Sequence, residues 1–194
     1  MAPVQPNRPR PSASPDCVAE ALTGLRAGDS GAFDIVYHAY RTRLYGFLLR
    51  LTRDAALAQD LSQETWLRLA ANAGRLAADT QLQAWLFRVA RNLFVSQRRW
   101  LIVQEACLSA LRLARAPNAL PTPLEQACVD ARALALERAL GALAVRDREV
   151  LLLVTVEGLN ANEVATIVGT SHAAVRKRLS RARAALARAL EEDT

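Results

Sequence analysis

The prolines of this 194-residue chain are confined to two short segments. Five lie within the first 15 residues, and Pro117, Pro121 and Pro123 lie within a single ten-residue stretch. Proline lacks a backbone donor and clashes with the preceding turn, so helix interiors exclude it. The distribution therefore predicts helical domains separated by proline-bearing segments. The predicted parts are an irregular arm at 1–16, a first domain at 17–100, a flexible linker at 101–123 and a second domain at 124–190.

Both domains are predicted to be all-α. Hydrophobic residues make up 52% of the chain and aromatic residues only 5%, and alanine and leucine, which are good helix formers, dominate. Apolar residues at spacings of three and four predict one helix over 33–51, and further helices are expected at 54–70 and 81–100 around a loop at 72–80. Residues 101–115 either extend the third helix or form a helical tether. The second domain is predicted to contain helices at 124–140, 146–156, 161–168 and 172–190.

The charge balance favours a polyanionic partner. The formal net charge is +6, and Lys177 is the only lysine among the 25 basic residues. Arginine suits bidentate contacts with phosphate, although a genome rich in G and C would also favour it. This charge alone does not distinguish nucleic acid from an anionic membrane surface.

Other features narrow the class of protein. The chain carries no signal peptide, and its longest apolar run, 150–156, is too short to cross a bilayer, so we expect a cytoplasmic protein without membrane insertion. Cys17, Cys107 and Cys128 lack metal or redox spacing and are expected to be free thiols, and His38 and His172 are isolated. We expect no cofactor, no metal and no catalytic group, because the sequence shows no nucleophile–base pair, no paired carboxylates and no phosphate-binding glycine loop.

The segment DLSQETW, Asp60 to Trp66, places an acidic face on the second helix. At 100° per residue, Asp60, Gln63, Glu64 and Leu67 share one arc. An acidic, amide-bearing face with an apolar centre suits docking on a basic protein. The alternative is a solvated face in which Glu64 pairs with Arg68 one turn later.

The segment AWLFRVARNLFVSQRRW, Ala84 to Trp100, is basic and contains no acid. Trp85, Val89, Leu93 and Trp100 are predicted to line its apolar side. The basic arc, which Phe87 and Phe94 border, suits an unstacked nucleic-acid strand. The alternative is a core helix with a solvated basic back. The residues of the arc are Arg88, Arg91, Asn92, Arg98 and Arg99.

The C-terminal segment has the spacing of a helix-turn-helix. Asn160 and Glu163 predict a capping box, and Ala165, Gly169 and Val175 fall where a close crossing, a tight turn and an apolar contact are needed. The last helix carries six cations and no acid between 171 and 190, a self-repulsion that DNA phosphates would relieve. A basic amphipathic helix on a membrane surface is the alternative.

Together, these segments resemble the sigma-70 family of bacterial RNA polymerase sigma factors, in its extracytoplasmic-function (ECF) group. The resemblance spans about 29–100 and 130–188. It implies two helical domains, the second a helix-turn-helix, and a factor that binds core RNA polymerase and directs promoter recognition and opening. It further implies promoter DNA as a partner and an anti-sigma factor as a regulator, and it implies that the loop at 72–80 helps to hold a flipped base.

The resemblance also implies residue roles. The polymerase clamp would be contacted by Asp60, Leu61, Gln63, Glu64 and Leu67. The minus-ten element would be contacted by Arg88, Arg91, Asn92, Arg98 and Arg99. The minus-thirty-five element would be contacted by Ser171, His172, Arg176, Lys177, Arg178 and Arg181.

The chain departs from the family pattern at several positions. Gln59 and Ser96 stand where acids are usual, and Ala144 replaces a proline common before the second helix of the second domain. Ser171, Ala173 and Ala174 also differ from the usual residues, so the family's base preference does not carry over.

Two other functions remain open from sequence. A helix-turn-helix regulator that acts without joining the polymerase would explain the C-terminal segment but not the acidic face and the basic helix together. A structural helical bundle with a basic tail would leave the turn spacing unexplained.

Overall fold

The computed structural model describes residues 15–111 and 131–192, and every regular element within those ranges is a helix. The all-α prediction is therefore confirmed for this part of the chain. The arm 1–14, the linker prolines and Cys128 lie outside the described residues, as do the side chains of Cys17 and Cys107. The elements are α1 (Pro15–Arg26), α2 (Ser30–Thr52), α3 (Ala55–Asn72), the 3₁₀ turn η1 (Ala73–Arg75), α4 (Leu82–Leu111), α5 (Ala131–Ala142), α6 (Val145–Thr155), α7 (Ala161–Val168) and α8 (His172–Glu192).

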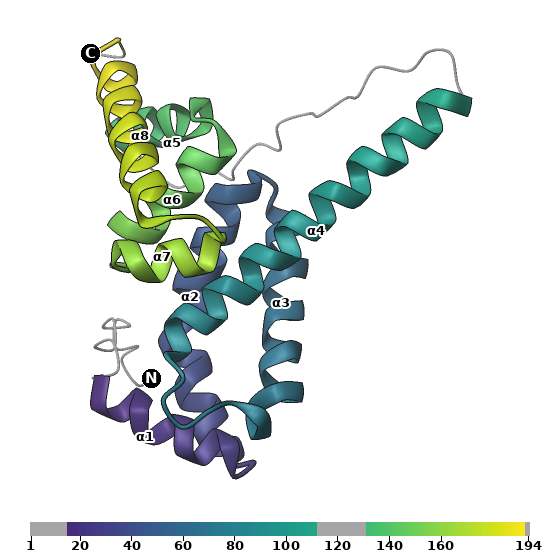
Figure 1. Ribbon diagram of the computed structural model, residues 1–194, viewed down its shortest axis with the longest axis vertical. Coiled ribbons are helices and arrows are strands. Elements are labelled where there is room, and N and C mark those ends of the chain that lie inside the picture. Colours follow the sequence, from purple (N-terminus) through teal and green to yellow (C-terminus); the bar gives the residue numbers. More distant parts are fainter. Residues whose placement is uncertain (1–14, 112–130, 193–194) are drawn as a thin grey trace, which may run out of the picture.

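Helices α2, α3 and α4 form the first domain, and α1 packs against α2 (Figure 1). The carboxylates of Asp29 and Asp54 cap α2 and α3, accepting hydrogen bonds from the backbone N–H groups of Gly31 and Leu57. The core between the helices contains Leu44, Phe47 and Phe87, all of which are fully buried. Phe47 and Phe87 meet edge to face with their ring centroids 5.2 Å apart.

Helix α4 is longer than the first domain requires. It continues without a break to Leu111, so the structure supports the first of the two alternatives for residues 101–115 as far as Leu111. Figure 1 shows the C-terminal part of α4 projecting away from the other helices. Trp100, which is predicted to line the apolar side of this helix, is 57% exposed, because α4 has left the other helices by this point.

The second domain is the predicted helix-turn-helix, built on α7 and α8. Asn160 accepts hydrogen bonds from the N–H groups of Asn162 and Glu163, while Glu163 accepts from the N–H of Asn160, which confirms the capping box. Gly169 ends α7 with φ +67, a left-handed conformation that glycine adopts at no steric cost. Ser171 then accepts a hydrogen bond from the N–H of Ala174 and caps α8.

The second domain packs directly on the first. Helix α7 lies against α4, and α6 lies against α2. Buried side chains of α6 and α7, such as Leu153 and Val164, belong to the same continuous apolar cluster as Leu48 and Leu86 of the first domain. The two parts that the sequence separates by a linker therefore meet over an apolar contact. Within the described residues, no helix is long and apolar enough to span a membrane.

Candidate polymerase and nucleic-acid interfaces

The predicted docking face on α3 is present but narrower than expected. Asp60, Gln63 and Leu67 are exposed, and Leu67 is 65% exposed. Glu64 is half-buried and accepts a hydrogen bond from Arg68 at 2.9 Å, as the alternative interpretation of this face predicted. Leu61 is only 6% exposed and packs in the core, so it offers no surface to a partner here. The remaining face is Asp60, Gln63 and Leu67.

The basic arc on α4 is divided by the second domain. Arg88, Asn92, Arg98 and Arg99 are exposed. The side chain of Arg91 is only 20% exposed, because it donates to the Glu149 carboxylate of α6 at 2.8 Å. Four of the five predicted side chains are therefore accessible, and the fifth is held by the second domain.

The aromatic part of that prediction is wrong. Phe87 is completely buried and Phe94 is 5% exposed, so neither ring offers a face to a nucleic-acid base. The ring of Phe94 instead lies under the guanidinium of Arg98, 5.8 Å from its centroid. The more accessible aromatic side chains on α4 are Trp85, which is half-buried, and Trp100. Spacing alone could not separate these rings, because it does not show that Phe87 packs on Phe47 of α2 or that Phe94 lies beside the second domain.

The predicted recognition residues on α8 have different environments. His172, Arg176 and Lys177 are exposed, and Ser171 caps the helix. Arg178 is half-buried and faces the first domain, where it lines a hollow described below. Arg181 donates to Asp147 of α6 at 2.9 Å. Of the predicted cations, Arg176 and Lys177 are exposed and form no ion pair within the described residues, and both lie on the first two turns of α8, the part of a recognition helix that contacts base edges.

Two ion pairs with buried carboxylates bridge the domains. Besides Arg91 and Glu149, Arg43 of α2 pairs with Glu157 at 3.0 Å, and the side chain of Glu157 is only 1% exposed. The backbone carbonyl of Glu157 also accepts from Arg43 and from Gln83, at 3.1 and 2.6 Å. One carboxylate oxygen of Glu157, Oε1, is buried without a hydrogen-bond partner. These contacts fix the turn after α6 against the first domain.

Burial dominates the ionisation of both carboxylates. It raises the pKa of Glu149 above the usual range, although Arg91, Arg178 and Arg146 act in the opposite direction. It raises the pKa of Glu157 in the same way, against the opposing charges of Arg43 and Arg50. The domain contact therefore holds two carboxylates in surroundings that disfavour their charge.

Arg148 was missed by the sequence analysis. It is 5% exposed and donates to the carbonyls of Gly141 and Leu143 in its own domain and of Arg50 at the end of α2. It therefore joins the end of α2 to the turn between α5 and α6. Since Arg148 stands in the charged run RDRE, no sequence signal distinguishes it from its exposed neighbour Arg146.

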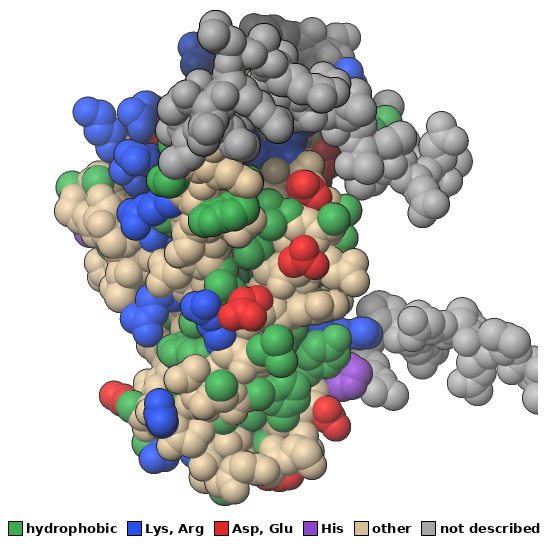
Figure 2. Space-filling view, turned by 90° about the vertical axis from the view of Figure 1, so that its right-hand side faces the viewer, with side chains coloured by type: hydrophobic (Ala, Val, Ile, Leu, Met, Phe, Trp, Pro, Cys, Tyr) green, Lys and Arg blue, Asp and Glu red, His purple; other side chains and the backbone are tan. Residues whose placement is uncertain are grey.

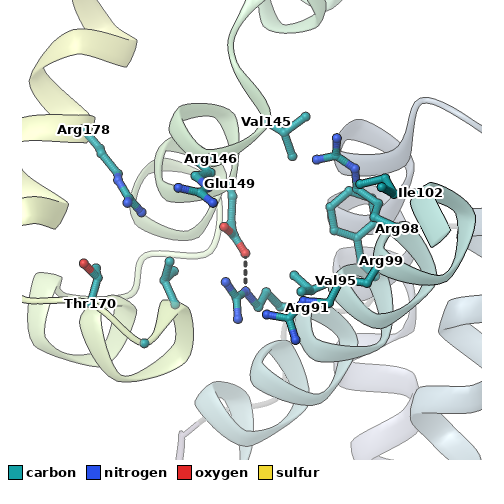
Figure 3. A pocket seen from close by; sticks show the side chains of 13 residues that line it. Arg91, Val95, Arg98, Arg99, Ile102, Val145, Arg146, Glu149, Thr170 and Arg178 are labelled. Atoms are coloured by element: carbon teal, nitrogen blue, oxygen red, sulfur yellow. Dashed lines mark hydrogen bonds and ion pairs between the residues drawn. The ribbon is translucent and has the colours of Figure 1, made fainter. Parts of the chain in front are cut away.

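A hollow of about 540 Å³ lies between α4 and the second domain (Figure 3). We call it the arginine pocket, because five guanidinium groups and a single carboxylate line it. In Figure 3, side chains from α4 face side chains from α6, α7 and α8 across this space. Its charged lining residues are Arg91, Arg98, Arg99, Arg146, Glu149 and Arg178.

Figure 2 shows one face of the charge distribution. Many basic side chains follow the left edge of the visible face, and most acidic side chains lie nearer its middle and right, where some basic side chains also occur. Exposed apolar side chains lie among the acidic ones. A basic edge suits a nucleic acid, and an acidic-apolar area suits a basic protein.

Comparison with known families assigns both domains. The model described as sigma-70 region 2 matches residues 36–100, and the model described as sigma-70, region 4 matches residues 133–186. These ranges contain the α3 face, the basic arc of α4 and the recognition residues of α8.

Two similar proteins carry names that describe sigma factors. The ECF RNA polymerase sigma factor SigM of Mycobacterium tuberculosis is 32% identical over 180 residues, which cover 89% of this chain and 84% of the relative. The probable RNA polymerase sigma factor RfaY of Xanthomonas campestris pv. campestris is 37% identical over 171 residues, 84% of this chain but only 41% of that longer relative.

A solved structure has the same fold. It is the sigma factor RpoE in complex with the anti-sigma factor NepR from Bartonella quintana. The likeness has a TM-score of 0.59 at 25% identity and covers 91% of this chain and 96% of that chain.

Proposed function

Because this chain belongs to the ECF group of the sigma-70 family of RNA polymerase sigma factors, we propose a division of its surface among three contacts in transcription initiation. The protein binds core RNA polymerase and acts on promoter DNA. Asp60, Gln63 and Leu67 of α3 dock on the polymerase. The exposed part of the basic arc on α4 engages the minus-ten element, and the first turns of α8 read the minus-thirty-five element.

The observation that carries this division is that α3, α4 and α8 each expose a different set of side chains. The α3 face presents one free carboxylate and an exposed leucine. The exposed residues of the arc, Arg88, Asn92, Arg98 and Arg99, present three cations and an amide. Helix α8 adds His172, Arg176 and Lys177 at its start. Arginine and lysine suit phosphate and guanine, and an acidic-apolar patch suits a basic protein.

The arrangement of the domains is not one that reads both promoter elements. The minus-ten and minus-thirty-five elements lie about 25 base pairs apart, or about 85 Å along B-DNA at 3.4 Å per base pair. In this structure Arg98 of α4 and Arg178 of α8 line the same pocket. We therefore propose that the domains separate when the protein joins the polymerase, which frees Arg91 from Glu149.

The remaining elements of the proposal follow from the same role. The chain acts as an initiation factor and performs no catalytic step itself. Its site of action is the polymerase in the cytoplasm. A protein of the anti-sigma class, such as the partner in the related RpoE structure, is the regulator that we propose for it.

The experiment is the affinity of the full chain for purified core RNA polymerase, measured with Asp60→Arg and Leu67→Asp. Each variant should bind about tenfold or more weakly, because Asp60→Arg reverses an interface charge and Leu67→Asp buries a new one. Glu20→Arg, a charge reversal on the exposed side of α1, is the matched control and should bind like the wild type. Equal affinity in all four proteins would refute the α3 docking face, and absence of binding by a folded wild type would favour the regulator that acts without polymerase.

A further inference from the structure

We propose that the arginine pocket binds a small polyphosphate, the chemistry shared by inorganic polyphosphate and the phosphate chain of a nucleotide. This ligand site goes beyond promoter recognition, and it shares Arg98 and Arg99 with the proposed minus-ten surface. Its volume of about 540 Å³ lies within the range of about 300–1,000 Å³ typical of small-molecule sites.

The first observation is an excess of cations that have no ion-pair partner. Arg91 and Glu149 of the lining neutralise each other. The other four guanidinium groups, those of Arg98, Arg99, Arg146 and Arg178, form no ion pair within the described part of the chain. Their charges are felt locally, since Arg178 and Arg146 both act to lower the pKa of the buried Glu149. Four like charges around one hollow repel one another, and an anion with several charges would remove that repulsion.

The second observation is an uncapped helix N-terminus at the same place. Ala144, the N-cap of α6, has no side chain that can accept from the N–H groups of the first turn. The next two residues, Val145 and Arg146, line the pocket. A helix N-terminus favours negative charge through its free N–H groups and its dipole. The positive end of α6 and the four arginines therefore act on one space.

The third observation is the composition of the remaining wall. Phe94, Val95, Ile102, Val145 and Val168 supply apolar surface beside the arginines. These apolar side chains do not bind phosphate oxygens, but they can pack against the ring of a nucleotide base. A nucleotide should therefore bind more tightly than an inorganic chain of equal charge.

Ligand binding would also affect the domain arrangement. Arg98 and Arg99 belong to α4, whereas Arg146 and Arg178 belong to α6 and α8. A polyphosphate that contacts the arginines of both domains binds the closed arrangement more tightly than an arrangement with the domains apart. It therefore stabilises the closed arrangement by the difference between these two binding free energies. The pocket would thereby connect the level of a phosphate metabolite to the availability of the sigma factor.

Titration calorimetry of the full chain with inorganic tripolyphosphate, and separately with ATP, tests the proposal. Arg146→Gln is the informative variant, because Arg146 is exposed and belongs to none of the proposed polymerase or promoter contacts. We expect one tripolyphosphate per chain and a loss of about tenfold in affinity in Arg146→Gln. Arg188→Gln, which removes an equal charge from an exposed position of α8 outside the arginine pocket, should bind like the wild type.

Three results would overturn the proposal. One is the absence of saturable tripolyphosphate binding by the folded wild type. Another is an equal loss in Arg146→Gln and Arg188→Gln, which would indicate general charge attraction. The third is an equal loss of affinity for tripolyphosphate and for a short single-stranded DNA in Arg146→Gln, because the pocket would then be part of the nucleic-acid surface. Core polymerase binding by the same variants is measured separately, so failure of the ligand site is distinguished from failure of the sigma role.

Discussion

The two domains bury their apolar side chains in different ways. The first domain has a core of its own between α2, α3 and α4, with Phe47, Phe87 and Leu69 almost completely buried. The second domain divides its apolar side chains. Leu140, Leu143, Leu151 and Ala182 form a small separate cluster, whereas Leu153 and its neighbours on α6 and α7 join the core of the first domain.

This difference shows that a linker in the sequence need not separate two independent folding units. The second domain has the turn and caps of a helix-turn-helix but leaves one apolar side to be covered by α2 and α4. Covering that side buries Glu149 and Glu157, which then require Arg91 and Arg43. When the domains separate on the polymerase, another surface must cover the same side chains.

The largest effect is expected from Leu153→Ala. Leu153 is completely buried in the shared cluster, and such a truncation costs about 2–5 kcal/mol of stability. All three tryptophans, Trp66, Trp85 and Trp100, lie in the first domain, and Trp85 also lines a hollow shared with α7, so their fluorescence reports on the first domain and on its contact with α7. Denaturant unfolding followed by fluorescence should therefore shift to a lower midpoint, although the substitution is in the second domain.

Leu140→Ala is the control for this prediction. Leu140 belongs to the separate cluster of the second domain. The Leu140→Ala substitution should lower the helix signal in circular dichroism at a given denaturant concentration. It should shift the midpoint of the fluorescence transition less than Leu153→Ala does. If Leu153→Ala left the tryptophan transition unchanged, the two cores would be independent.

The next effect concerns two arginines that bridge the same domains. Arg91→Ala leaves the carboxylate of Glu149, whose side chain is 4% exposed, without its partner, and should cost about 3 kcal/mol of stability at neutral pH. Arg50→Ala breaks an ion pair with Glu137 in which both side chains are more than a third exposed, and should cost less than about 1 kcal/mol. Chemical denaturation of the two variants measures both values. Equal costs would mean that burial of Glu149 does not decide the strength of the domain contact.

Much of the fold was predictable because its signals are local. The capping box at Asn160 and Glu163 and the turn at Gly169 depend on residues within a few positions of one another, and the structure confirms both of them. The helix spanning 161–168 was predicted with its observed bounds. Local hydrogen bonds leave a pattern in the sequence whatever the rest of the chain does.

Sequence patterns do not show where distant segments meet. The helical wheel puts Arg91 on an open basic face, whereas its guanidinium bonds to a carboxylate 58 positions later, and its contact with the minus-ten element stays a prediction. Phe87 and Phe94 were assigned to a nucleic-acid surface, but they lie in the core. A helical wheel shows which residues share a side and not what covers that side, so the domain contact and the arginine pocket could not be foreseen.

The pH dependence of the domain contact is a third test. Burial raises the pKa of Glu149 and of Glu157 while the domains are together, so the closed arrangement binds protons more tightly than the open one. The contact should be strongest below the ordinary carboxyl value of 4.5 and should weaken as pH rises through the raised values. The charged groups that face the two carboxylates are Arg43, Arg50, Arg91, Arg146 and Arg178.

Small-angle scattering measures this effect as a radius of gyration that increases with pH. The double variant Glu149→Gln with Glu157→Gln keeps side chains of similar shape that do not titrate, so its radius should vary much less. A wild-type radius that falls as pH rises would contradict the assignment of burial as the dominant cause.

The smallest expected effect contrasts the N-termini of two neighbouring helices. Helix α7 has a complete capping box, whereas α6 begins at Ala144, whose backbone (φ −55, ψ 137) already has a non-helical conformation typical of an N-cap. Ala144→Ser supplies the missing acceptor and should raise the free energy of unfolding by about 0.5–1 kcal/mol, while Asn160→Ala should lower it by about 1 kcal/mol. The serine would also occupy an N–H group that the arginine pocket offers to an anion, so tripolyphosphate affinity should fall in Ala144→Ser and stay unchanged in Asn160→Ala. A more stable protein with weaker tripolyphosphate binding would indicate that the N-terminus of α6 takes part in binding the anion. A more stable protein whose tripolyphosphate affinity is unchanged or higher would mean that it takes no part.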